Sequence, residues 1–322
     1  MMQENKLISF HRMLINDAVR TAAYRDAIFA TVRPGDVVLD VGSGSGVLAL
    51  FAAQAGAGHV HCVERHAIIR VARELAEANG FANRISFHQC DIRALELDGP
   101  VDLIQSELIS KAAIGEQMAE LVGWCRDRFL RPGGALLPPS VDMFVAPVEL
   151  AALAARISLP AFETYGLDFG PLATRNSNAP VSTRIQPEEV IAPGQICYRY
   201  DAATAPLTDS FDAALVFEVS EARTLTGFTI WFETELAPGI LLGNAPPGTG
   251  SWDHLFFALP YPLALTRGDC VELRISGRDD SAMEWLVRWD TRIVRGGIEI
   301  AAHRQSTFHG GLPIAERVTA PA

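Results

Sequence analysis

A glycine-rich loop between two apolar runs constrains the fold of this chain more than any other feature. The run 36–41 predicts a short buried strand, and the run Val47–Ala55 predicts a buried helix. The loop that joins them reads Asp40-Val-Gly-Ser-Gly-Ser-Gly46. Glycines let a backbone turn sharply and approach a ligand closely. A strand, a glycine loop and a helix in this order predict a doubly wound α/β sheet.

The segments that follow keep alternating between strand and helix patterns as far as residue 138. Strands are predicted at His59–Val63, 85–87 and 101–105. Helices are predicted at 66–79 and at Met118–Phe129, the second one stopped by the turn residues Arg131-Pro-Gly-Gly134. Strands that alternate with helices imply βαβ units and therefore a parallel sheet.

Beyond Pro138-Pro139 the pattern changes to short apolar segments separated by turns rich in proline and glycine. The segments that predict strands are 141–148, 213–219, 225–233 and 270–275. We therefore predict a ligand-binding α/β domain over residues 1–138. A second, mostly antiparallel and β-barrel-like domain is predicted over residues 139–322.

Composition excludes several classes of function. Lys and Arg total 27 against 38 Asp and Glu, and the resulting formal charge of −11 argues against a nucleic-acid surface. No apolar run approaches the roughly 20 residues of a membrane span. The N-terminus lacks the pattern of a secretory signal, so we expect a cytoplasmic protein without a membrane partner. The five cysteines form no CxxC pair, so no metal site is expected.

The glycine loop also distinguishes between nucleotide ligands. A phosphate-binding NTPase loop ends in Gly-Lys-Ser/Thr, and a dinucleotide loop has a third glycine where this chain has Val47. Asp40 is unfavourable beside a pyrophosphate but suits a ligand that carries an ammonium group. Glu64 ends the second strand, where a carboxylate can bind both ribose hydroxyls. Asp91 follows the third strand, where it can lie near an adenine edge.

These residues resemble class I S-adenosylmethionine-dependent methyltransferases, and more narrowly the protein arginine methyltransferase family. The similarity is strongest in Asp17-Ala-Val-Arg-Thr-Ala-Ala-Tyr24 and from Val37 to Glu64. It implies a Rossmann-like methyltransferase domain with S-adenosylmethionine as cofactor, and Arg20 on the cofactor carboxylate. The other cofactor-binding residues that the resemblance implies are His11, Asp40, Gly42, Gly44, Gly46 and Glu64.

The family also carries two glutamates on the loop after its fourth strand. Ser106-Glu107 resembles the start of that loop, and Glu116 stands at the spacing of the second glutamate. A guanidinium is planar, presents five donors and stays protonated. Two carboxylates can hold it by charge-assisted hydrogen bonds and orient one nitrogen towards the sulfonium methyl. We therefore predict Glu107 and Glu116 as catalytic residues and a cationic guanidino acceptor, although Glu116 alone would also suit a helix start.

The second domain has its own points of resemblance. Pro139 falls where the family passes into its barrel, and Tyr165-Gly166 resembles part of the family's dimerisation arm. We expect an arm near residues 155–175 to pair two copies into a homodimer. Its apolar residues include Leu159, Phe162, Tyr165, Leu167 and Phe169.

Three departures from the family pattern bear on the acceptor. The family's N-terminal aromatic motif is absent before His11. The barrel loop reads Gly250-Ser-Trp252, without the family's histidine, and Arg93 replaces a glutamate near the adenine, which leaves Asp91 as the candidate there. The first two departures favour a small guanidino acceptor over a folded protein.

Three functions stay open at this point. The first is N-methylation of a guanidino group on free arginine, a related metabolite or a protein side chain. The second is methylation of another small-molecule amine or hydroxyl, with Glu107 as the base. The third is a non-catalytic S-adenosylmethionine-binding partner of an active methyltransferase. Trp252 and His254 are candidates for the acceptor pocket, and Lys111 either neutralises a glutamate or points to solvent.

Overall fold

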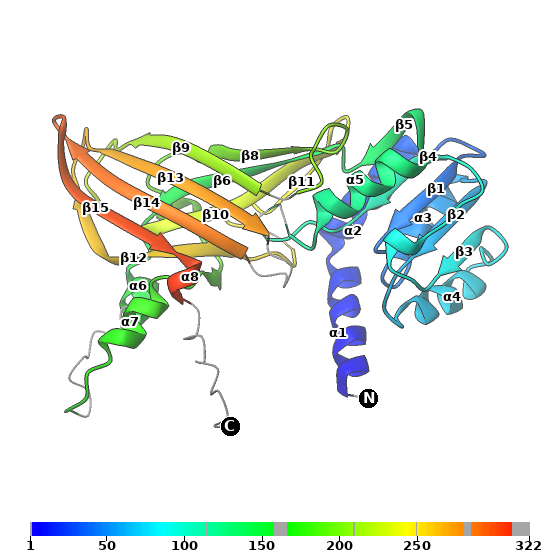
Figure 1. Cartoon of the computed structure of the whole chain (residues 1–322), viewed down its shortest axis with the longest axis horizontal. Helices are drawn as coiled ribbons and strands as arrows, with labels where there is room; N and C mark the ends of the chain where they lie inside the picture. The colour runs from blue at the N-terminus through cyan, green and yellow to red at the C-terminus, as the bar shows by residue number, and fades with distance from the viewer. Residues whose placement is uncertain are drawn as a thin grey trace, which may run out of the picture.

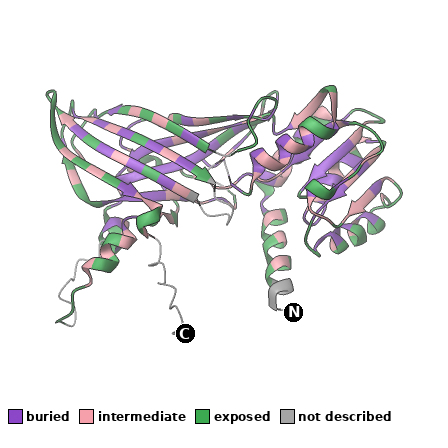
Figure 2. Ribbon diagram, in the orientation of Figure 1, coloured by how far each residue is buried: buried purple, intermediate pink, exposed green. Residues whose placement is uncertain are grey.

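The computed structural model describes residues 2–111, 113, 115–157, 166–208, 210–248, 250–279 and 285–310. One part of the molecule holds a parallel sheet with helices, and the other holds long antiparallel strands beside it (Figure 1). Buried side chains alternate with exposed ones along those strands (Figure 2). No helix among the described residues is long and apolar enough to cross a membrane.

The parallel sheet has five strands in the order β3-β2-β1-β4-β5. Their bounds are β1 Val37–Val41, β2 His59–Val63, β3 Ile85–His88, β4 Val101–Ser106 and β5 Leu130–Leu137. The helices that join them are α3 (Val47–Ala55), α4 (Ile69–Ala78) and α5 (Met118–Phe129), with the short turn η1 (Ile92–Ala94) after β3. The strand order reverses between β1 and β4, which is where open α/β sheets bind their ligands. The predicted doubly wound sheet is confirmed.

The prediction of a turn directly after α5 is wrong. The helix ends at Phe129, and Arg131-Pro-Gly-Gly134 lies within β5. The pairing of β5 with β4 shifts register between Val101 and Leu103. This irregularity lets the strand accommodate a proline, which cannot donate to the ladder, and two glycines.

Two helices precede the sheet. The first, α1 (Met2–Asn16), projects away from the body, whereas α2 (Ala18–Thr31) lies against it (Figure 1). Tyr24 and Ile28 on α2 are fully buried. Asp17 lies between the helices, and its Oδ1 accepts a hydrogen bond from the backbone N–H of Arg20 at 3.1 Å. This contact caps α2 and fixes the start of the helix that carries Arg20.

The second part of the chain forms two antiparallel sheets. In one the order is β7-β12-β10-β6-β8, with β11 on β10, and in the other it is β15-β14-β13-β9. The strands are β6 Ser140–Val148, β7 Val181–Thr183, β8 Gln195–Asp201, β9 Ser210–Glu218, β10 Arg223–Ala237, β11 Ile240–Gly243, β12 His254–Leu265, β13 Cys270–Asp279, β14 Trp285–Arg295 and β15 Ile298–Ser306. The antiparallel character is confirmed. Among the described residues no ladder joins the two sheets, so closure into a barrel is not seen.

Short helices accompany these sheets. They are α6 (Ala151–Ile157), α7 (Gly170–Asn176), α8 (Thr307–Gly310) and the single turn η3 (Pro187–Glu189). The predicted arm falls partly outside the described residues, because Leu159, Phe162 and Tyr165 lie there. Its described part includes Leu167 and Leu172, whose side chains are exposed.

Candidate active site

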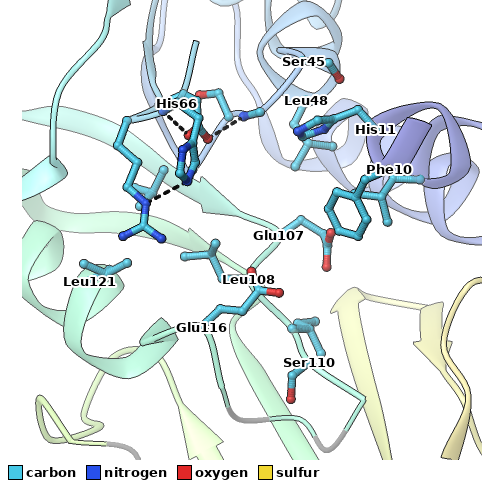
Figure 3. A pocket seen from close by; sticks show the side chains of 18 of the residues that line it. Phe10, His11, Ser45, Leu48, His66, Glu107, Leu108, Ser110, Glu116 and Leu121 are labelled. Atoms are coloured by element: carbon cyan, nitrogen blue, oxygen red, sulfur yellow. Dashed lines mark hydrogen bonds between the residues drawn. The ribbon is translucent and has the colours of Figure 1, made fainter. Parts of the chain in front are cut away.

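A pocket of about 740 Å³ opens at the carboxyl ends of β1, β2 and β4. The glycine loop and the end of β2 line one part of the pocket, the loop after β4 lines another, and α1 contributes further lining residues such as Phe10 and His11. Figure 3 shows Glu107 and Glu116 near each other inside it, with Phe10 and His11 of α1 close by. A pocket of this size can hold a cofactor and a small acceptor together.

The glycine loop is shaped by two tight contacts. Gly44 and Gly46 have φ of +53° and +79°, a region that disfavours other residues. A Cβ at Gly44 would lie 2.3 Å from the His11 ring, and one at Gly46 would lie 2.6 Å from the Ala72 Cβ. The loop therefore needs glycine both for its backbone and for the close approach of α1 and α4.

The carboxylate of Glu64 is held at the edge of this loop. One oxygen accepts from the Gly44 N–H at 3.1 Å, and the other accepts from the His66 N–H at 2.7 Å. The residue is buried yet lines the pocket. Each carboxylate oxygen has a second lone pair, so Glu64 can still accept from the hydroxyls of a ligand.

His11 and Asp40 lie on either side of the loop. His11 lines the pocket, and its burial lowers its pKa while Glu64 opposes that change. Asp40 is buried beneath the loop, and burial raises its pKa to about 6, against the effect of Ser43 and Gln105. Among the described residues neither Asp40 oxygen has a well-formed hydrogen bond. A positively charged ligand nearby would favour its ionised form.

Arg20 points into the pocket from α2 and forms an ion pair with Glu107. Its Nη1 also donates to the Leu14 carbonyl at 3.2 Å, and its guanidinium lies 5.8 Å from the centre of the Trp252 ring. The buried Nε has no hydrogen-bond partner in the described part of the chain. A buried donor without a partner is costly, so this side of Arg20 suits a ligand that brings an acceptor.

The two glutamates reach the pocket from one loop. Glu107 follows β4, and its side chain is largely buried. Burial raises its pKa to about 7, although the charge of Arg20 lowers it. Glu116 precedes α5, has φ of +52° and is open to the pocket. Its pKa is also raised, by desolvation first, while Arg20 and Arg65 lower it. Glu116 is therefore not part of the first turn of α5, which begins at Met118.

Asp91 lines the pocket, but it already has a partner. It caps η1 and accepts from both Nε and Nη2 of Arg93, at 2.9 and 2.8 Å. Arg93 also reaches Glu120 at 2.8 Å. The hydrogen bond from Arg93 is the main reason that the pKa of Asp91 falls to about 2. Arg93 thus holds Asp91 in place, a link that the sequence analysis did not foresee.

The barrel-side loop is the segment between β11 and β12 that carries Ser251 and Trp252. It contacts α2 and the loop after β4, and the sequence analysis did not predict these contacts. Asp17 Oδ2 accepts from the Ser251 backbone N–H at 2.5 Å, so one carboxylate joins the start of α2 to this loop. The Trp252 indole donates to the carbonyl of Ile109, two residues after Glu107, at 3.2 Å. Trp252 lines the pocket as expected. His254 does not: it is buried, and its Nδ1 accepts from the Ile185 N–H at 3.2 Å.

Two family models match the chain. One is described as a methyltransferase domain and covers residues 33–168, and the other is the arginine methyltransferase oligomerization subdomain over residues 140–290. Protein arginine N-methyltransferase 6 of Xenopus laevis is 30% identical over 256 residues, which is 75% of this chain and 75% of that protein. The chain belongs to the protein arginine N-methyltransferase family. It is an S-adenosylmethionine-dependent methyltransferase.

Other relatives extend the comparison. The arginine N(omega)-methyltransferase of Streptomyces achromogenes subsp. streptozoticus is 28% identical over 279 residues, 84% of this chain and 76% of that one. A Trypanosoma brucei PRMT1 enzyme-prozyme complex with AdoHcy matches with a TM-score of 0.83 at 24% identity, over 92% of this chain and 96% of that chain. Arabidopsis thaliana protein arginine methyltransferase 10 matches with a TM-score of 0.81, at the same identity and coverage. These structures share the fold of this chain.

Proposed function

We propose that the enzyme transfers the methyl group of S-adenosylmethionine to a guanidino nitrogen, on free arginine, a small arginine derivative or a protein side chain. One observation carries this proposal: Glu107 already binds a guanidinium inside the pocket, that of Arg20. A carboxylate placed to pair with one guanidinium can pair with a second, because its two oxygens accept up to four hydrogen bonds. Glu116 adds a second carboxylate nearby.

We assign the cofactor to the wall formed by the glycine loop. Glu64 is proposed to bind the ribose hydroxyls, and Asp91 lies where the adenine edge is expected. Arg20 is proposed to bind the cofactor carboxylate with donors that Glu107 does not use. The remaining predicted residues, His11, Asp40, Gly42, Gly44 and Gly46, form the loop and its supports. Support for the assignment comes from the buried Nε of Arg20 and from the close packing of His11 on Gly44.

Glu107 and Glu116 have two tasks in the proposed reaction. S-adenosylmethionine supplies a methyl carbon that is already electrophilic. The two carboxylates bind the acceptor guanidinium, concentrate its charge on one side and orient the opposite nitrogen. The nitrogen loses one proton when it gains the methyl group. Glu107 suits the role of proton acceptor, because burial gives its carboxylate a pKa of about 7 and so a higher basicity than an exposed glutamate.

A substrate screen tests this function. Purified enzyme with methyl-labelled S-adenosylmethionine is offered L-arginine, other guanidino compounds, arginine-rich peptides, and amines or hydroxyl compounds of similar size. Transfer to at least one guanidino compound is the expected result. Transfer only to amines or hydroxyls would contradict the proposal and would favour Glu107 as a base for another acceptor.

We also infer a homodimer. The match to an oligomerization subdomain over residues 140–290 supports it, as do the exposed Leu167 and Leu172 in the described part of the predicted arm. Light scattering at micromolar concentration should give twice the 34.9 kDa of one chain. A clean monomer mass would rule the dimer out. The cytoplasmic location and the lack of nucleic-acid or membrane partners stay predictions from composition, and fractionation of the source cells checks them.

A further inference from the structure

Lysine is rare in this chain, and one of its lysines lies in the active site. The sequence contains 25 arginines but only two lysines, Lys6 and Lys111. Lys6 is exposed on α1. Lys111 lines the pocket, on the loop that carries Glu107 and Glu116. Its ammonium is a compact charge with three donors, unlike the planar fork of arginine.

The contacts of Lys111 differ from both sequence-based expectations. It neither neutralises a glutamate nor points freely to solvent: its Nζ donates to the Ser182 hydroxyl of β7 at 2.7 Å. Ser182 in turn donates to Asp253 Oδ2 at 3.1 Å. The Lys111 carbonyl accepts from Asn244 Nδ2 at 3.4 Å, so the residue is held from two sides.

Within the described residues, the ammonium charge of Lys111 is not neutralised by an ion pair with a carboxylate. In the part of the chain that the structure describes, none of the ion pairs includes Lys111. The nearby Asp253 is paired with Arg184, whose Nε lies 2.9 Å from it. The charges that act on Glu116 come from Arg20, Arg65 and Glu64. Within the described residues, the bond to Ser182 uses one of the three Lys111 donors, and the other two are available to a ligand.

The loop after β4 therefore brings charges of opposite sign to the acceptor side of the pocket. Glu107 and Glu116 are its negative groups, and Lys111 is its positive group, with the ammonium held at the rim by Ser182. A ligand that carries a guanidinium and a carboxylate complements the charges of both signs, whereas a basic peptide would bring further positive charge towards Lys111. We propose that Lys111 binds the carboxylate of the acceptor, which makes the substrate a free guanidino amino acid. This inference rests on the proposed function and narrows it.

The sharpest kinetic test compares L-arginine with L-argininamide. The two differ only in that the amide replaces the carboxylate, so the amide keeps the guanidinium and the α-ammonium and lacks the negative charge. We expect kcat/KM for L-arginine to exceed that for L-argininamide by about tenfold, carried mainly by KM, because one charge-assisted contact is lost. Lys111→Met should remove this preference, and Lys111→Arg should keep most of it. Lys6→Met is the matched control and should leave both rates unchanged.

A labelling experiment reads binding without methyl transfer. An amine-selective acylating reagent can modify only the N-terminus and two lysines, and mass spectrometry separates Lys6 from Lys111. With S-adenosylhomocysteine present, L-arginine should slow the acylation of Lys111 but not of Lys6, and L-argininamide should protect much less. This measurement uses the wild-type enzyme, so it stands even if a Lys111 variant does not fold.

The outcomes separate this inference from the proposed function. Equal rates on L-arginine and L-argininamide, methylation of peptides alone, or unprotected Lys111 would overturn the carboxylate site while guanidine methylation stands. If no guanidino compound is methylated, the proposed function fails. Protection of Lys111 by L-arginine in that case would still support the carboxylate site.

Discussion

The two ends of the pocket are built in different ways. The cofactor end, which we define as the glycine loop with Glu64, is assembled from β1 and β2 and the turns that directly follow them. The acceptor end, defined as Glu107, Glu116 and Trp252, combines the loop after β4 with a loop from the second part of the chain. The structure of the cofactor end is therefore determined by segments that are close together in the sequence. The acceptor end depends on contacts between residues more than a hundred positions apart.

The electrostatics of the two ends differ as well. Glu64 accepts two backbone N–H groups, which satisfies its charge without any cation. Glu107 is covered and depends on one buried arginine. A carboxylate that relies on a single charged partner is far more sensitive to a change in that partner. The cofactor end should therefore be less sensitive than the acceptor end to the loss of a single charged partner.

The largest effect is expected from Glu107→Gln, which keeps the size of the side chain and removes its charge. Loss of one partner of a desolvated charge pair costs about 2–5 kcal/mol, so kcat/KM for the acceptor should fall by at least about thirtyfold. Cofactor affinity should change much less. Steady-state kinetics and calorimetry measure the two effects, and the exposed Glu74→Gln on α4 is the control. Full activity in Glu107→Gln would refute the paired-carboxylate mechanism.

Next in size is Glu64→Ala at the cofactor end. Hydrogen bonds to a charged group contribute about 1.5–3 kcal/mol, so the Kd for S-adenosylmethionine should rise about tenfold to a hundredfold. Titration calorimetry measures it, with Glu74→Ala as the matched variant. An unchanged Kd would mean that Glu64 only supports the loop.

A change of pH tests the charge of Glu107 at the acceptor end, with Glu107→Gln as the comparison. The raised pKa of Glu107, about 7, means that acidification protonates it and removes the charge that binds the guanidinium. At saturating cofactor, acceptor kcat/KM should therefore decrease as pH falls, with a midpoint at or below about 7, because bound cations favour the ionised form. Glu107→Gln should lack this acidic limb. A wild-type profile that is flat between pH 8 and 5.5 would exclude Glu107 as the titrating group.

The smallest effect is expected from Asp17→Ala, which disconnects the start of α2 from the loop that carries Ser251 and Trp252. The substitution removes the cap of α2 and the contact to Ser251. A lost cap costs about 0.5–2 kcal/mol, which for a chain of this size lowers Tm by a few degrees. Acceptor KM should rise more than cofactor Kd, because Ser251 and Trp252 belong to the barrel-side loop. Equal changes in both would show that Asp17 only stabilises the fold.

The sequence predicted the cofactor end more fully than the acceptor end, for a physical reason. The glycines, β1, β2 and Glu64 are specified by short-range patterns, so their order along the chain reveals their arrangement. Glu107 and Glu116 were found through spacing, but their partner was not, because the pairing with Arg20 depends on how α2 packs on the sheet. Arg93 on Asp91 and Asp17 on Ser251 were missed for the same reason. His254 was misassigned because it begins β12 and is buried against Ile185, a contact between residues far apart in the sequence.

The contact between His11 and Gly44 has a consequence for how the chain can evolve. The imidazole fills the space that any side chain at position 44 would need. Substitutions at positions 11 and 44 are therefore coupled. A side chain at position 44 requires either the loss of the His11 ring or a shift of α1. The position of α1, which otherwise projects from the body, therefore depends on the absence of a side chain at Gly44. In homologues that lack the histidine, position 44 should be constrained by its backbone conformation alone.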